Sequence, residues 1–264
     1  MQLLTVSEIW IYPVKSLGGI ALNTARVLPK GIECDRRWML IDSDNRCMTQ
    51  RDHPRMACFQ LSYVPDGFLV RHEEERIFLP FSAKGTSLSA IIWNDVVEVV
   101  EVSEELSQWF SSRLEFQCRL VSFPEINTRV VDQVYAQNNE QVSLADGYPL
   151  LIIGQASLDD LNQRMLTPLP MNRFRPNIVF TGGEPYEEDG WHHFRIADTG
   201  FAGVKPCGRC VLTTVDQERG EKAGKEPLAT LARYRQREKN VLFGQNLLVT
   251  NEGIINRGDH IILE

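Results

Sequence analysis

The feature that most constrains the fold of this chain is a series of short segments rich in β-branched and aromatic residues. In the first hundred residues such segments lie at 9–14, 25–29, 36–44, 59–72, 76–81 and 96–102, separated by Asn, Asp, Gly and Pro. β-Branched and aromatic side chains favour a pleated, half-buried strand, whereas the separating residues favour turns. The regular alternation of strand and helix that builds a doubly wound sheet is missing from this pattern. The first part of the chain is therefore predicted to consist mostly of strands.

Helical periodicity occurs in only a few places. A first helix is expected to open at Ser103, because apolar residues follow it at helical spacing, namely Leu106, Trp109, Phe110 and Leu114. A second is expected from Ser157, whose hydroxyl can cap its first turn, with Leu158, Leu161 and Met165 on its core face. A third is expected over 228–237, with Pro227 in its first turn.

The remaining segments of the second half again resemble strands. They lie at 148–154, 177–182, 192–198, 200–206, 211–216 and from 242 to the C-terminus. The polar stretch 124–147 is predicted to be a long connection, of a kind that is often functional. Together these segments predict an α+β fold that is mainly β, with about three helices.

Composition narrows the function classes. The chain has 264 residues, of which 43% are hydrophobic, which suits one large or two modest domains with a core. We find neither a run approaching the roughly 20 apolar residues of a membrane span nor the pattern of a signal peptide. The six cysteines are therefore expected to be reduced thiols of a cytoplasmic protein. A net charge of −7 argues against a general nucleic-acid binder but leaves room for local basic pockets.

The sharpest chemical feature is Lys-Pro-Cys-Gly-Arg-Cys at 205–210. A zinc site needs four ligands, and no second pair with suitable spacing is present. A thioredoxin-like pair needs a helix after its first cysteine, whereas 211–216 has a strand pattern. Two ordinary buried thiols are also compatible with the local sequence. Lys205 and Arg209 favour a thiolate, the form that binds metals.

Basic residues elsewhere suggest an anion site. Arg173 and Arg175 lie two apart in Asn-Arg-Phe-Arg-Pro-Asn at 172–177, and in extended chain they would point to the same side. Lys15 and Ser16 precede a glycine pair, and Asp-Arg-Arg-Trp follows at 35–38. The spacing of a P-loop is absent, so nucleotide binding is not favoured. Each arginine taken alone is equally compatible with a surface charge.

Together these fragments resemble the MOSC family, named for the C-terminal domain of molybdenum-cofactor sulfurases. The segments YPVKS, DRRWMLID and TQRDHPR resemble its N-terminal β-barrel domain, whereas RFRPNIVF, KPCGRCVLTTVD, LFGQN and the closing G-x-I-x-x-G-D resemble MOSC itself. The motifs are most similar to the branch of the mitochondrial amidoxime-reducing component and its bacterial relatives. The resemblance implies a β-barrel-like domain at 1–122, followed by a β-barrel MOSC domain at 123–264.

The resemblance also implies a cofactor site. In this branch the second cysteine of the pair, here Cys210, is the protein ligand of the molybdenum in a molybdenum cofactor. Further cofactor contacts are implied at Lys15, Ser16, Arg36, Tyr148, Arg175, Asn177, Gly208, Arg209 and Asn246, although Tyr148, Gly208 and Asn246 differ from the family's usual residue types. An anionic pterin with a phosphate requires such cationic and amide donors. Because the two basic segments lie in different halves, the cofactor is expected between the domains.

The implied activity is reduction of N-hydroxylated compounds, namely hydroxylamines, amidoximes and N-hydroxylated bases. The chain carries no iron–sulfur cysteine run, so electrons are expected from a separate redox protein of ferredoxin or flavodoxin type. No nucleic-acid or membrane partner is expected. The alternative is a carrier that holds a persulfide or the molybdenum cofactor on Cys210 and passes it on without turnover of its own.

Overall fold

One large sheet runs through the molecule in the computed structural model, which describes residues 3–136 and 138–264. β12 and β13 run parallel, and every other pair of neighbours in this sheet is antiparallel. In spatial order its strands are β2 (Ile20–Leu22), β1 (Thr5–Ile11), β13 (Ile178–Thr181), β12 (Leu150–Gly154), β19 (Asn240–Asn251), β15 (Thr199–Arg209), β14 (His193–Ile196) and β21 (Ile261–Leu263), with β18 (Gln236–Arg237) added beside β19.

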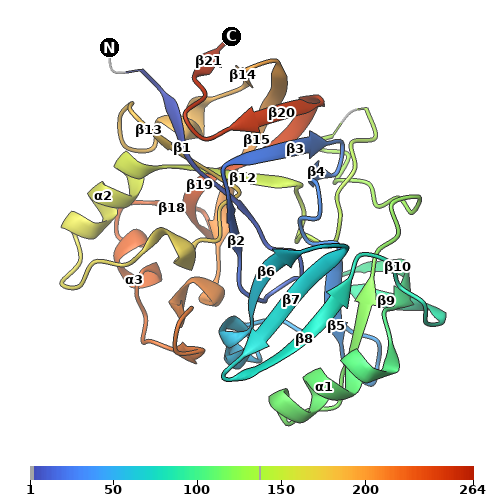
Figure 1. Cartoon of the computed structure of the whole chain (residues 1–264). Coiled ribbons are helices and arrows are strands. Elements are labelled where there is room, and N and C mark those ends of the chain that lie inside the picture. Colours follow the sequence, from blue (N-terminus) through green and yellow to red (C-terminus); the bar gives the residue numbers. More distant parts are fainter. Residues whose placement is uncertain (1–2, 137) are drawn as a thin grey trace.

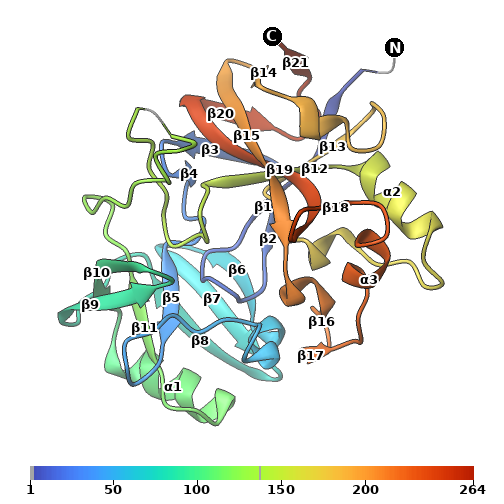
Figure 2. The ribbon, with the colours of Figure 1, turned by 180° about the vertical axis from the view of Figure 1, so that it is seen from behind.

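Four smaller sheets complete the strands, and Figures 1 and 2 show two of them, with α1, at the opposite end of the molecule from the two termini. One has four strands, in the order β5 (Trp38–Ile41), β11 (Arg119–Ser122), β10 (Asp95–Glu101) and β9 (Ser87–Ile92). The others are a meander of β6 (Gln60–Val64), β7 (Gly67–His72) and β8 (Glu75–Pro80), a sheet of β20 (Gly253–Asn256), β3 (Thr24–Leu28) and β4 (Gly31–Ile32), and the pair β16 (Val215–Asp216) and β17 (Glu221–Lys222).

The described residues thus form a mainly β structure, which confirms the predicted fold class. The N-terminal strands share sheets with the second half of the chain, because β1 pairs with β13 and β3 pairs with β20. One hydrophobic cluster contains residues of both halves, among them Ile9, Val27, Phe180 and Ile255. Each such side chain, once fully buried, contributes about 1.5–3 kcal/mol. The boundary between residues 122 and 123 stays a prediction.

The first helix agrees with its sequence pattern. α1 covers Glu104–Leu114, and the side chain of Ser103 accepts a hydrogen bond from the amide of Leu106 at 3.2 Å. Leu106, Phe110 and Leu114 are buried against the first-half core. A serine oxygen at this position satisfies an amide that the helix itself leaves free.

The second helix begins earlier than predicted. α2 covers Gln155–Gln163, its cap residue is Gly154, and Ser157 is not the cap. The buried carboxylate of Glu188 instead accepts from the amide of Gly154 at 3.1 Å and from the hydroxyl of Ser157 at 2.9 Å. An acceptor from a distant segment thus satisfies the amide of the cap residue, and the hydroxyl of Ser157 donates to that acceptor rather than capping the helix.

Two further expectations were wrong in part. The third helix, α3, extends only over Leu228–Leu231, because the end of the predicted segment, Gln236–Arg237, pairs with β19 as strand β18. The segment 211–216 is not a strand throughout: Val211–Thr214 form a short 3-10 helix, and only Val215–Asp216 belong to β16.

Other parts of the chain are irregular. Between β11 and β12 the described residues of 124–147 form no helix or strand and contain one isolated bridge, Val130 with Gln141, which agrees with the predicted long connection. Residue 137 lies outside the described residues. Three more short 3-10 helices cover Pro54–Cys58, Met171–Arg173 and Glu187–Gly190. In the described chain no helix is long and apolar enough to cross a membrane.

Candidate functional site

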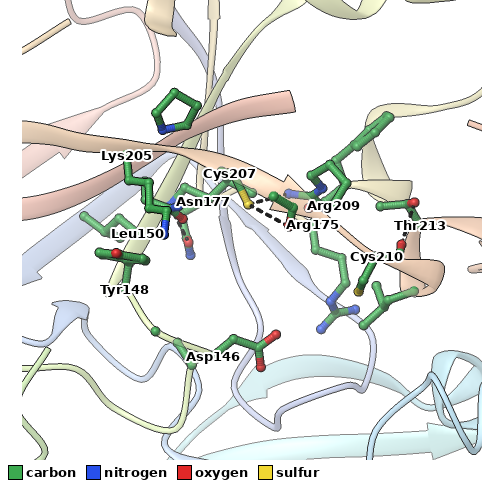
Figure 3. A pocket seen from close by; sticks show the side chains of 18 of the residues that line it. Asp146, Tyr148, Leu150, Arg175, Asn177, Lys205, Cys207, Arg209, Cys210 and Thr213 are labelled. Carbon is green, nitrogen blue, oxygen red and sulfur yellow. Dashed lines mark hydrogen bonds between the residues drawn. The ribbon is translucent and has the colours of Figure 1, made fainter. Parts of the chain in front are cut away.

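A cavity of about 370 Å³ lies where the end of β15 meets loops from both halves of the chain (Figure 3). The N-terminal half contributes the turn after β1, the turn before β5 and the loop after β5. The second half contributes the end of the 124–147 connection, the segment before β13, and facing parts of β15 and β19. All ten of the site residues predicted from the sequence line this cavity: Lys15, Ser16, Arg36, Tyr148, Arg175, Asn177, Gly208, Arg209, Cys210 and Asn246.

Cys210 lies at the point where β15 ends. Its carbonyl accepts hydrogen bonds from the amide of Thr213 at 3.1 Å and from the hydroxyl of Thr213 at 3.0 Å, which hold the short helix that follows. Its Sγ atom accepts a hydrogen bond from Nε of Arg51 at 3.2 Å. The thiol is partly exposed, so its sulfur is accessible to a ligand in the cavity.

Arg51 and Asp146 are site residues that the sequence analysis missed. Arg51 also donates from Nη2 to Asp146 at 2.8 Å, and its guanidinium lies 4.6 Å from the ring centre of Trp93. Asp146 accepts in addition from Lys15 and from the indole of Trp93. Arg51 lies within TQRDHPR, a segment already used for the family resemblance, so that motif was the available signal.

Arg36 and Arg175 form the basic floor of the cavity around Tyr12. Their guanidinium groups lie 4.7 and 4.1 Å from the ring centre of Tyr12. Arg36 donates to Asp35 at 2.5 Å and to the side-chain oxygen of Asn177 at 3.0 Å. Arg175 is 7% exposed and makes no ion pair with the described carboxylates; its one side-chain hydrogen bond is a long one, 3.4 Å, to Gln217.

The pKa values reflect these environments. Burial, reinforced by the charge of Arg36, lowers the pKa of Arg175 to about 10. Burial also raises the pKa of Tyr12 to about 12, although both arginines oppose the rise. Burial alone would raise the pKa of Asp146, but Lys15 and Arg51 hold it well below its ordinary value. Asp146 is therefore a permanent anion, and Arg175 is a cation whose charge the fold leaves poorly compensated.

Backbone conformation marks the same residues. Ser16, Arg36 and Arg175 adopt left-handed backbone, with φ of 67°, 50° and 53°. This conformation costs a non-glycine residue about 1–2 kcal/mol. Strained backbone persists where the surrounding structure imposes it, and it often accompanies function.

Cys207 lies on the same wall, but its environment is local. Its Sγ accepts from Nη1 of Arg209 at 3.1 Å, two residues along β15, and its side chain packs against a hydrophobic cluster of the second half. Arg209 also donates to the carbonyl of Phe174 at 2.7 Å, while its buried Nε has no partner among the described residues.

The expected pairing of Arg173 with Arg175 was wrong. Met171–Arg173 form a 3-10 turn rather than extended chain, so the two guanidinium groups diverge. Arg173 donates to Asp216 at 2.8 Å and to the carbonyl of Thr214 at 3.2 Å, and it does not line the cavity. Of these two arginines, only Arg175 lines the cavity.

The cavity is strongly basic in an acidic protein. Its described lining includes six cationic side chains and one carboxylate, Asp146, although the chain as a whole carries a net charge of −7. In the described part of the chain we find no cluster of three or more His, Cys, Asp or Glu residues that could hold a bare metal ion. The arrangement therefore suits an anionic ligand, with a thiol at hand.

Comparison with known proteins gives the class to which this architecture belongs. Residues 3–117 match the MOSC N-terminal β-barrel domain, and residues 139–262 match the MOSC domain. The chain belongs to the MOSC-domain family.

Within that class it is similar to amidoxime-reducing components of animals. It is 34% identical to mitochondrial amidoxime-reducing component 1 of Mus musculus, in an alignment that covers 99% of this chain and 83% of the relative. Component 1 of Homo sapiens gives the same three values. Mitochondrial amidoxime-reducing component 2 of Bos taurus is 33% identical, with 98% of this chain and 83% of the relative covered.

Proposed function

We propose that this protein binds a molybdenum cofactor in the basic cavity, with Cys210 as the protein ligand of the metal, and that it reduces N-hydroxylated compounds. The observation that carries the proposal is Arg175, a buried cation without an ion-pair partner among the described residues, in the same cavity as an accessible thiol. Burying an uncompensated charge is costly, and an anionic ligand removes that cost. The names of the similar relatives support the substrate class.

The donor set fits the cofactor. A pterin phosphate needs charge-assisted donors, which Arg175, Arg36 and Lys15 supply. Asn246 in the cavity lining adds a neutral side-chain amide donor, and Asn177 holds Arg36 in place by accepting its hydrogen bond. Molybdenum has a high affinity for sulfur, and a thiolate is the soft ligand that the chain offers at Cys210. When bound, the cofactor supplies two-electron chemistry at the substrate's N–O bond.

The overall reaction fixes what the protein must provide. An N–O bond breaks, two electrons and two protons enter, and the products are the reduced nitrogen compound and water. Asp146 remains ionised, so it is not the proton donor; it holds the cationic side chains of Lys15 and Arg51 at the mouth of the cavity. Lys15 lines the cavity and is the candidate proton donor to a leaving oxygen.

We propose a separate electron donor for this reaction. The sequence offers no dinucleotide fingerprint and no iron–sulfur cysteine run. The six cysteines are all free thiols, which fits the proposed cytoplasmic setting. A small ferredoxin- or flavodoxin-type protein that docks transiently would meet the need, and its docking should weaken with salt.

The test combines metal analysis with turnover. Freshly purified protein is assayed for molybdenum and then given an N-hydroxylated substrate, such as benzamidoxime, with reduced viologen as electron source. We expect bound molybdenum and turnover with the dye, and no turnover with NADH or NADPH alone. Inactivity at full molybdenum occupancy would favour the carrier function, as would a persulfide on Cys210 in protein without metal. Rapid turnover with NADH alone would overturn the proposed electron supply.

A further inference from the structure

Arg51 occupies an unusual position for a surface-loop arginine. It comes from the loop after β5, in the N-terminal half, yet its Nε reaches Sγ of Cys210, in the second half, at 3.2 Å. The side chain is 20% exposed, and four groups fix its position: the sulfur, Asp146, the Trp93 ring and its own backbone bond to Thr49. The contact therefore joins the two halves of the chain at the one atom proposed to bind the metal.

Asp146, the carboxylate that holds Arg51, accepts hydrogen bonds on both of its oxygens. Asp146 accepts from Arg51 on Oδ2 and from Lys15 and Trp93 on Oδ1. An arginine held by a carboxylate keeps a fixed fork geometry, so its Nε–H points in one direction. That direction is toward the sulfur of Cys210.

We propose that Arg51 is a positioning residue for the metal ligand, and that its N–H···S hydrogen bond raises the reduction potential of the metal held by Cys210. This inference rests on the proposed function. Hydrogen bonds to ligating sulfurs and nearby outer partners set the potential of thiolate-bound metals. A cation that donates to the thiolate stabilises the more reduced, more negative state, so its loss lowers the potential.

The other arginines of the cavity do not share this geometry. Arg209 donates to the sulfur of Cys207, which is not the proposed ligand, and Arg36 is held by Asp35. Arg175 lies over Tyr12 and bonds Gln217. Among the described residues, the side chain of Arg51 alone donates to the sulfur of Cys210.

The test is a redox titration of intact, molybdenum-containing protein, followed by the electron paramagnetic resonance of the metal. Arg51→Gln removes the charge and the Nε–H and leaves only a shorter, neutral amide, and Arg51→Lys keeps the charge without the Nε–H. Arg55→Gln is the matched control, because Arg55 comes from the same segment, is 67% exposed and lies outside the cavity lining. Molybdenum content and unfolding temperature are measured for every variant.

For Arg51→Gln we expect the ratio of reduced to oxidised metal at a fixed potential to fall about tenfold, which corresponds to about 59 mV for a one-electron couple. Arg51→Lys should shift in the same direction by less, and it carries the test if Arg51→Gln does not retain the metal. Unchanged potentials in metal-containing Arg51 variants would overturn the proposal, as would an equal shift in Arg55→Gln. Wild-type protein that binds no molybdenum would instead overturn the proposed function, and this inference with it.

Discussion

Two pairs of like residues in this molecule have opposite environments. Cys207 receives its hydrogen bond from Arg209 on the same strand, whereas Cys210 receives one from Arg51, a residue of the other half of the chain. Arg173 is satisfied by Asp216 and Thr214, whereas Arg175 is buried with only a long contact to Gln217. In each pair, one member is satisfied by its own half of the chain. The other member lines the cavity and has either a partner from the other half, as Cys210 does, or a weak partner, as Arg175 does.

The contrast separates structural residues from functional ones. A side chain whose strong partners all come from its own half of the chain mainly stabilises the fold. A cationic or nucleophilic side chain that lines the cavity and lacks a strong partner from its own half is a candidate for ligand binding. Substituting one member of each pair at a time should therefore separate effects on the free energy of unfolding from effects on cofactor binding.

The largest effect is expected at the cysteines. Cys210→Ser should reduce activity with reduced viologen by at least about 100-fold, because a hydroxyl replaces the soft sulfur ligand. Cys207→Ser should retain most of the activity and should lower the free energy of unfolding by about 1 kcal/mol, since its side chain packs at the edge of a hydrophobic cluster and accepts one local hydrogen bond from Arg209. Steady-state rates and chemical denaturation measure both. The reverse ranking of the two variants would break the comparison.

Arg175→Ala should act next most strongly, and on the cofactor. A charge-assisted contact contributes about 1.5–3 kcal/mol, so occupancy at limiting cofactor should fall about tenfold or more. The free energy of unfolding of cofactor-free protein should stay unchanged or rise, because a poorly compensated buried charge is removed. Molybdenum content and denaturant titrations provide the two readouts. Full occupancy in this variant would mean that Arg175 does not hold the anion.

Arg173→Ala is the matched change and should have the opposite profile. It removes the ion pair with Asp216 and one of the two donors to the carbonyl of Thr214, so the free energy of unfolding should fall by about 1–3 kcal/mol. Molybdenum per folded protein should be close to the wild-type value. A selective loss of cofactor here, with stability intact, would show that the two arginines are not separated as the structure indicates.

Many of the residues that line the cavity could be predicted from the sequence, because motifs preserve residue types at fixed spacing. The ten residues that the family resemblance implied line one cavity, although their roles stay predictions. Periodicity also sufficed for α1, whose cap and apolar stripe are local. The mainly β class followed from the many strand-like segments.

What the sequence could not give depends on contacts between distant residues. Ser157, expected to cap α2, instead donates to Glu188, a residue 31 positions away that also accepts from the amide of Gly154. The backbone turn at Met171–Arg173 separates two arginines that simple alternation would place together. The contact of Arg51 with Cys210 spans 159 positions, and no local pattern encodes it.

The most direct test of the central claim is to count the sulfur atoms bound to molybdenum by X-ray absorption at the metal edge. The cofactor itself provides two sulfurs, so we expect three in wild-type protein and in Cys207→Ser, and two in Cys210→Ser. An unchanged sulfur count in Cys210→Ser, or a loss in Cys207→Ser instead, would contradict the assignment of Cys210 as the metal ligand.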